Sequence, residues 1–283
     1  MPTEAFSHRV EPHLRALYQM NRSALRQAGH LRSLGGNRMN LLRRKANPLA
    51  HPRSLPSIER LNVPDIEADI YRELYRGIEY IVAAGVHGDV AEFGTSSGRT
   101  AMTLAKGIAN YDERYRTHSE KLGIAARKLR LFDSFEGFPE ARDPIDKIAP
   151  QISSGVWGPG VTKDASPAVL LDMCTTYLEA SRIVVSPGWY RDTMPKLEPG
   201  VKFAMVHIDC DFYESTMDVL DRLFTIDALS DGCAVFFDDW YCNRGSLEFG
   251  EPKAWTDCIA KHRPRFTDWG PYATVGHRFI IHK

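Results

Sequence analysis

Two apolar stretches of this sequence end in pairs of carboxylates. HIDCDFYEST (residues 207–216) follows VKFAMV and contains Asp209 and Asp211, and CAVFF is followed by Asp238 and Asp239. Buried carboxylates are costly unless they are paired, hydrogen-bonded or bound to a cation, and neighbouring ones raise each other's pKa. A hard divalent cation such as Mg²⁺ would supply the missing charge. The alternative is a structural cluster held by arginine or backbone amides.

The spacing of Asp209 and Asp211 suggests that they have different roles. Alternate residues of an extended strand share a face and lie about 6–7 Å apart. Both carboxylates could therefore hold one small ion only if the chain bent between them. We assign Asp209 to the metal with Asp238 and Asp239, and Asp211 to proton abstraction or to holding the acceptor, so that Asp209 and Asp211 are the predicted catalytic residues.

Two other apolar runs end in residues typical of a nucleoside site. EFGTSSGRT (residues 92–100) has a glycine turn of the form G-x-x-x-G, which lets a ligand approach backbone N–H groups. This spacing differs from the G-x-G-x-x-G of dinucleotide sites. LFDSFEGFP ends its apolar run at Asp133, which could accept both hydroxyls of a ribose. The alternatives are a plain turn at Gly94 and a capping role for Asp133.

The elements that must position these residues alternate along the chain. An amphipathic helix is predicted over residues 64–85, with further helices at 99–109, 167–180 and 214–224. Strands are predicted at 88–94, 128–134, 181–188, 201–210 and 231–240. Nearly continuous apolar strands alternating with helices indicate a parallel sheet covered on both faces. The last twenty residues predict a hairpin that turns at Gly270-Pro271, so we expect seven strands with the last one antiparallel.

The chain is predicted to have two parts. Residues 1–62 form a basic arm and linker, and residues 1–53 contain nine Arg and one Lys against two Glu. Phe6 and Tyr18 are the only aromatic residues of residues 1–53, too few to interleave these charges as stacking sites, so packing on the body or on a second subunit is favoured over nucleic-acid binding. Residues 63–283 form the main domain, in which the Pro- and Gly-rich stretch 139–166 around Trp157 is a predicted lid.

Composition narrows the class of protein further. The formal net charge of the 283 residues is zero, which gives no general attraction to nucleic acid or to an anionic membrane. The five cysteines include no C-x-x-C pair, which favours reduced thiols over a zinc site. No apolar run reaches the roughly 18 residues of a membrane span. We expect a cytoplasmic protein that does not contact a membrane.

The ordered set of motifs resembles one known family. GDVAEFG, LFDSFEGFP, GWYRDTMP, HIDCDFYEST and FFDDW together look like the macrocin O-methyltransferase family, over residues 65–240. Members of that family are metal-dependent S-adenosylmethionine enzymes that methylate sugar hydroxyls of macrolide and aminocoumarin antibiotics. The resemblance implies a class I methyltransferase fold, a Rossmann-like sheet of seven mostly parallel strands with helices on both faces.

The resemblance also implies roles for individual residues. The cofactor site would be lined by Glu92, Gly94, Ser97, Asp133 and Ser134, with Gly188 and Trp189 near the adenine. Mg²⁺ would be bound by Asp209, Asp238 and Asp239, with Asp211 as a candidate base. The family usually has Trp-Arg-Gly-Gly after the first glycine, where this chain has Thr95 to Gly98.

These observations predict a Mg²⁺-dependent O-methyltransferase that acts on a hydroxylated small molecule, such as a sugar or a natural-product glycoside. Two alternatives remain: a metal-dependent phosphoester hydrolase, because clustered aspartates also suit two-metal chemistry, and a non-catalytic nucleoside-binding protein. The hydrolase would leave the Gly94 turn and Asp133 without a role.

Overall fold

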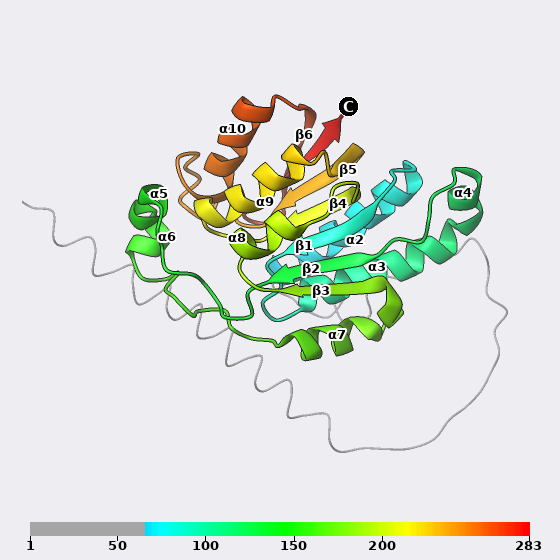
Figure 1. The fold of residues 1–283 in the computed structure, drawn as a ribbon, viewed down its shortest axis with the longest axis horizontal. Helices are drawn as coiled ribbons and strands as arrows, with labels where there is room; N and C mark the ends of the chain where they lie inside the picture. Colours follow the sequence, from blue (N-terminus) through cyan, green and yellow to red (C-terminus); the bar gives the residue numbers. More distant parts are fainter. Residues whose placement is uncertain (1–65) are drawn as a thin grey trace, which may run out of the picture. The chain divides into compact units, whose positions relative to one another are not determined.

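The structure, a computed structural model, describes residues 66–283. The predicted arm and linker at 1–62, and the subunit contact predicted for them, lie outside the described residues. The described chain forms a seven-stranded sheet in the order β3-β2-β1-β4-β5-β7-β6, with helices on both faces (Figure 1). The strands are β1 (Asp89–Phe93), β2 (Leu129–Asp133), β3 (Ile183–Pro187), β4 (Phe203–Ile208), β5 (Leu229–Phe237), β6 (Arg265–Tyr272) and β7 (Gly276–His282).

Two apolar cores flank this sheet. One lies under α2 (Ile66–Ala83), α3 (Arg99–Arg114) and α7 (Pro167–Thr175), and the other under α9 (Tyr213–Thr225) and α10 (Gly250–His262). The predicted amphipathic face of α2 is confirmed, since Leu74, Ile78 and Ile81 are fully buried. Burying each such side chain contributes about 1.5–3 kcal/mol. The shorter helices are α4 (Arg116–Lys121), α5 (Pro144–Ile148), α6 (Pro150–Ser153), α8 (Tyr190–Thr193), η2 (Ala180–Arg182) and η3 (Met194–Lys196).

The strand order explains where a ligand would bind. β1 pairs in parallel with β2 on one side and with β4 on the other. The direction in which the chain adds strands reverses between β1 and β4, which makes this the topological switch point. Ligands of open parallel sheets bind beyond the carboxyl ends of the strands at such a point. Figure 1 shows α5 and α6 near these ends.

The predicted antiparallel last strand is confirmed, but the predicted turn is wrong. β7 runs antiparallel to both β5 and β6, and the chain turns at residues 273–275. Gly270 and Pro271 lie inside β6, where the pairing shifts between Asp268 and Gly270. β6 is the edge strand of the sheet, and an edge strand tolerates a proline and a glycine bulge.

Several helices differ from the sequence-based expectation. α7 ends at Thr175, before the predicted end at residue 180, and the predicted lid contains α5 and α6 and is therefore not a plain loop. α10 was not predicted, because Gly250 and Pro252 suggest a loop. Proline is tolerated in the first helical turn, and Trp255 and Cys258 are buried further along the helix.

Within residues 66–283, no helix has both the length and the apolar character needed to cross a membrane.

Candidate active site

The candidate site begins where β4 ends at Ile208. Asp211 has a φ of 59°, and the Phe212 N–H donates to the Cys210 carbonyl at 2.5 Å, so the chain turns sharply after Asp209. Carboxylate oxygens of Asp209, Asp211 and Asp239 consequently lie within 4.8 Å of one another. The chain thus bends between Asp209 and Asp211, which is the condition under which both carboxylates could hold one ion, and their separate roles stay a prediction.

Asp238 lies next to this group but outside it. Its Oδ1 accepts the hydroxyl of Tyr272 at 3.2 Å and lies 3.6 Å from Nε2 of His207. Its backbone N–H donates to the Ile208 carbonyl at 2.9 Å, which holds the ends of β5 and β4 together. Of the three predicted metal ligands, Asp209 and Asp239 thus lie in the compact group, and Asp238 lies beside it.

The crowded carboxylates have raised pKa values. Desolvation, followed by the charges of Asp238 and Asp239, raises the pKa of Asp209 well above its usual range. Desolvation and the charges of Asp239 and Asp209 do the same to the pKa of Asp211. Protonated carboxyls relieve this repulsion, and a bound cation would relieve it equally well. The donor set is oxygen only, which suits a hard divalent ion.

Glu251, at the start of α10, hydrogen-bonds to the backbone on both sides of the carboxylate group. It was not among the residues predicted from the sequence. Its Oε1 accepts the N–H of Cys210 at 3.3 Å, and its Oε2 accepts the N–H of Asp239 at 2.9 Å. Its side chain is fully buried. Glu251 therefore ties the loop after β4 to the loop after β5. An acidic residue just before Pro252 is a helix-start signal that could have drawn attention to it.

Glu92 and His207 form a buried pair inside the sheet. The two residues are register partners on β1 and β4, and Nδ1 of His207 lies 2.9 Å from Oε1 of Glu92. Both are fully buried, and Oε2 of Glu92 has no hydrogen-bond partner within the described structure. In this structure the Glu92 carboxylate faces His207, so its predicted contact with a cofactor stays a prediction.

Asp133 organises the turn that follows β1. Its Oδ2 accepts the N–H groups of Thr95 at 2.7 Å and Ser96 at 3.2 Å, and its Oδ1 accepts the N–H of Phe135 at 2.6 Å. The alternative reading of Asp133 as a capping residue is therefore realised in this structure. Binding of a ribose by the same carboxylate stays a prediction.

The other predicted cofactor residues surround this turn. Ser97 lies between Thr95 and the start of α3, which Gly98 precedes with a φ of 79°. The Ser134 hydroxyl donates to the Gly137 carbonyl at 3.2 Å. Gly188 donates its N–H to the Asp133 carbonyl at 2.9 Å, and the guanidinium of Arg191 lies 5.4 Å from the Trp189 ring centre. The ends of β1, β2 and β3 thus carry the cofactor candidates, beside the carboxylates at the ends of β4 and β5.

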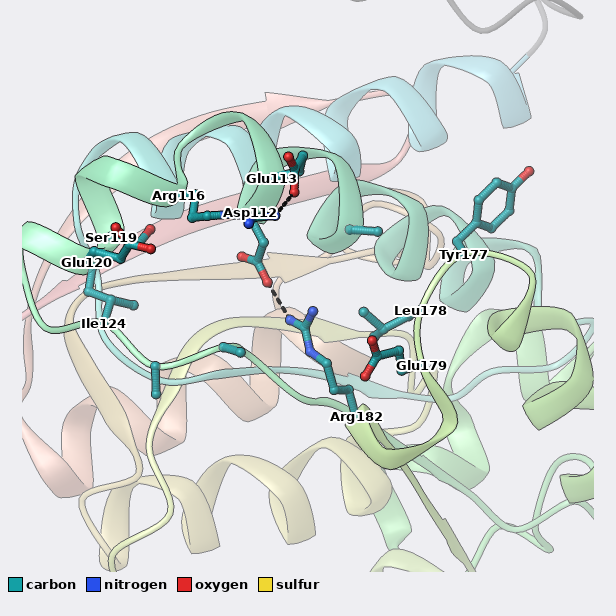
Figure 2. A pocket seen from close by; sticks show the side chains of 13 residues that line it. Asp112, Glu113, Arg116, Ser119, Glu120, Ile124, Tyr177, Leu178, Glu179 and Arg182 are labelled. Atoms are coloured by element: carbon teal, nitrogen blue, oxygen red, sulfur yellow. Dashed lines mark hydrogen bonds and ion pairs between the residues drawn. The ribbon is translucent and has the colours of Figure 1, made fainter.

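A separate cavity of about 450 Å³ lies at the opposite ends of the strands. Figure 2 shows it between α3, α4 and the segment before β3, with Asp112 paired to Arg182. Tyr177 and Glu120 are also among its lining residues, and none of these residues is a predicted site residue. This cavity is therefore distinct from the candidate active site.

Comparison with known proteins identifies the family. The sequence profile of the macrocin O-methyltransferases (TylF) matches residues 68–252. This chain belongs to that family. The family match covers β1 to the start of α10, and so includes every predicted site residue.

Two curated relatives are similar to this chain over part of their length. Mycinamicin III 3''-O-methyltransferase of Micromonospora griseorubida is 32% identical over 167 residues, which are 58% of this chain and 59% of that enzyme. The 8-demethyl-8-(2,3-dimethoxy-alpha-L-rhamnosyl)-tetracenomycin-C 4'-O-methyltransferase of Streptomyces olivaceus is 29% identical over 163 residues, 58% of this chain and 57% of that enzyme. The aligned part thus spans less than two thirds of each relative.

Solved structures agree with the fold of the family. The O-methyltransferase NovP superposes with a TM-score of 0.58 at 21% identity, over 76% of this chain and 81% of that chain. The calicheamicin methyltransferase CalS11 superposes with a TM-score of 0.54 at 23% identity, over 76% of this chain and 79% of that chain. The class I methyltransferase fold predicted from the sequence is therefore confirmed.

Proposed function

We propose that this protein is an O-methyltransferase that transfers a methyl group from S-adenosylmethionine to a hydroxyl of a small molecule, with Mg²⁺ bound beside the acceptor. One observation carries the proposal. Carboxylate oxygens of Asp209, Asp211 and Asp239 lie within 4.8 Å of one another, at the topological switch point of a sheet with the class I methyltransferase fold. A neighbouring strand end supplies a separate turn suited to a nucleoside, built on Gly94 and Asp133.

The cofactor would bind over the ends of β1, β2 and β3. Asp133 would receive the ribose hydroxyls, and the turn from Gly94 through Ser97 would bring backbone N–H groups close to the methionine part. Ser134 lies next to Asp133 in the sequence, while Gly188 and Trp189 follow β3 and would border the adenine. Glu92, near the end of β1, would also line the cofactor site.

The metal would be held by Asp209 and Asp239, with Asp238 as the third carboxylate. The oxygen-only donor set fits the ion, and the charge of Asp238 is the first electrostatic contribution to the raised pKa of Asp209. A bound Mg²⁺ would favour the ionised form of the acceptor hydroxyl and fix its direction of approach. Asp209 and Asp239 would keep their backbone positions because Glu251 accepts the N–H groups of Cys210 and Asp239.

Asp211 is the proposed proton acceptor. The high pKa of its carboxyl, caused by desolvation and then by Asp239 and Asp209, is accompanied by a hydrogen bond to Asp239. Asp211 can take a proton only in its ionised form, and the charge of a bound cation would favour that form. The acceptor oxygen would attack the methyl carbon as the carbon–sulfur bond breaks, and Asp211 would take the hydroxyl proton, releasing S-adenosylhomocysteine. A positioned base typically contributes about 10² to 10⁴-fold.

The acceptor is proposed to be a sugar hydroxyl of a natural-product glycoside. The support is the activity of the two curated relatives, a mycinamicin III 3''-O-methyltransferase and a rhamnosyl-tetracenomycin 4'-O-methyltransferase. A cytoplasmic location is also proposed, which the five unpaired cysteines support.

The direct test is transfer of labelled methyl from S-adenosylmethionine to a panel of hydroxylated glycosides, with Mg²⁺ or with a chelator. We expect labelled product with Mg²⁺ and a loss of product in the chelator. Equal product in both conditions would contradict the metal role. Release of phosphate from phosphoesters, without methyl transfer, would instead indicate a hydrolase.

A further inference from the structure

The helix that follows the candidate base has no cap of its own. α9 begins at Tyr213, and its N-cap position is occupied by Phe212, whose side chain makes no capping hydrogen bond. The turn before it is also unfavourable, because Asp211 has a positive φ of 59°. Such a conformation costs energy and persists only where surrounding contacts hold it in place.

The missing cap comes from the predicted lid. Asp146 of α5 accepts the N–H of Tyr213 at 2.7 Å and the N–H of Glu214 at 3.0 Å, across a separation of 67 and 68 residues. Its side chain is only 1% exposed. α5 does not need Asp146 for its own start, since Asp143 caps it by accepting the N–H of Ile145 at 2.7 Å.

Further contacts join the predicted lid, residues 139–166, to the loops after β4 and β5. Gln151 donates from Nε2 to the Cys242 carbonyl at 3.0 Å and from its backbone N–H to Oδ1 of Asn243 at 3.3 Å. Trp157 stacks on Phe212 with ring centres 6.3 Å apart, and Phe212 is 1% exposed. The lid segment therefore contacts both loops that carry the carboxylates.

We propose that Asp146 is a positioning residue for methyl transfer: by capping α9 it holds the turn that places Asp211. This inference rests on the proposed function, because it gives the lid a role in the same reaction. The hydrogen bonds of Asp146 go to the backbone of Tyr213 and Glu214, so it would act through that backbone. Loss of the cap would let the Asp211 turn relax while the cofactor turn around Asp133 stays intact.

The test compares Asp146→Ala and Asp146→Asn with the control Lys147→Ala in the full-length protein. Lys147 is the next residue of α5 and its side chain is exposed. Asparagine keeps one acceptor oxygen and is itself a good cap. Four quantities are measured: kcat and KM for the acceptor, the affinity for S-adenosylhomocysteine, and the rate of amide hydrogen exchange at Tyr213 and Glu214.

For Asp146→Ala we expect kcat to fall about 10²-fold, as for a small misplacement of a reacting group, with unchanged affinity for S-adenosylhomocysteine. Exchange at the two amides should become about fivefold faster, as for loss of a cap. Asp146→Asn should restore most of kcat, and Lys147→Ala should match the unmodified protein. An unchanged kcat in folded Asp146→Ala would overturn the proposal. An equal loss of kcat in Asp146→Asn and Asp146→Ala would also overturn it.

The two proposals fail in different ways. If the unmodified protein transfers no methyl group to any acceptor, the proposed function fails. If Asp146→Ala leaves exchange at Tyr213 and Glu214 unchanged, the capping role fails whatever the reaction is. Should Asp146→Ala not fold, the kcat and exchange of Asp146→Asn decide, because a buried side chain of the same size is retained; faster exchange at the two amides with an unchanged kcat, or a lower kcat with unchanged exchange, would then overturn the proposal.

Discussion

Gly94 and Asp209 are in backbone contact where β1 and β4 end: a Cβ atom on Gly94 would lie 1.9 Å from the carbonyl oxygen of Asp209. Gly94 also has a φ of 93°, which favours glycine. The glycine that looked like a ligand-binding feature is therefore required by the protein itself. It brings the proposed cofactor turn and the proposed metal loop into direct contact.

Replacing this glycine should damage both parts of the site. Gly94→Ala would push the Asp209 backbone away, whereas Gly123→Ala meets no atom within 4 Å at a similar positive φ of 65°. We expect Gly123→Ala to cost only the conformational term, about 1–2 kcal/mol. Gly94→Ala should cost more and should also weaken S-adenosylhomocysteine binding. Chemical denaturation and calorimetry measure the two effects, and equal results for both variants would refute this explanation.

The Glu92–His207 pair predicts a large stability effect. Burial lowers the pKa of His207, but the carboxylates of Asp238 and Glu92 outweigh it, so the pKa is raised well above its usual value. His207→Ala would leave Glu92 buried without its partner, and removing one member of a buried pair typically costs about 3–5 kcal/mol. Urea denaturation measures the loss. His118→Ala, an exposed histidine, is the control; a loss for His207→Ala no larger than for this control would contradict the role of the pair.

The cap formed by Asp146 should depend on pH with a definite sign. Burial raises its pKa to about 6 from 3.8, the N–H groups of Glu214 and Tyr213 oppose this, and the carboxylates of Asp143 and Glu214 add to it. The Asp146 carboxyl therefore holds a proton more tightly when it contacts the start of α9 than when it is exposed to water. The contact is consequently strongest below pH 4 and weakens as the pH rises to about 6. Each pKa unit corresponds to about 1.4 kcal/mol.

This pH dependence is measured by exchange at the Tyr213 and Glu214 amides, corrected for the intrinsic effect of pH. Protection in the unmodified protein should be greater at pH 5 than at pH 7.5. Asp146→Asn cannot titrate at this position and should show a smaller difference. A pH difference of the same size in both proteins would assign it to other groups.

The roles of Asp211 and Asp238 can be separated by amide substitutions. Asp238→Asn should weaken Mg²⁺ binding, because it removes a proposed ligand charge. Asp211→Asn should keep Mg²⁺ binding and lower kcat by about 10² to 10⁴-fold, the usual contribution of a general base. Calorimetric titration with Mg²⁺ and steady-state kinetics provide the two readouts. If Asp211→Asn instead weakened Mg²⁺ binding and Asp238→Asn did not, Asp211 would be the ligand. Its place in the compact group with Asp209 and Asp239 would agree with that result.

The sheet could be predicted because each strand is marked by the residues of its own short stretch of sequence. Apolar runs such as VKFAMV mark strands that are buried on both faces, and β4 is buried along its whole length. Strand ends of a parallel sheet meet at one edge, so the sequence also indicated that Asp209 and Asp239 would come together. The hairpin turn was misplaced because Gly270-Pro271 has the composition of a turn but lies on an edge strand.

The supporting residues were not predictable, because they depend on contacts between distant parts of the chain. The bend at Asp211 is stabilised by Asp146, which is 67 residues from Tyr213, and no local pattern announces it. Glu251 is 41 residues from Cys210, to which it binds. His207 has the sequence context of an ordinary strand residue, and its pair with Glu92 depends on the register between β1 and β4.

The central claim is that the carboxylates at the ends of β4 and β5 bind a metal that methyl transfer requires, beside a separate cofactor site. The most direct measurement is S-adenosylhomocysteine affinity and Mg²⁺-stimulated methyl transfer in Asp209→Asn and in the unmodified protein. We predict that Asp209→Asn binds S-adenosylhomocysteine normally but loses stimulation by Mg²⁺. Full Mg²⁺-stimulated activity in Asp209→Asn, or unchanged activity of the unmodified protein in a chelator, would contradict the account.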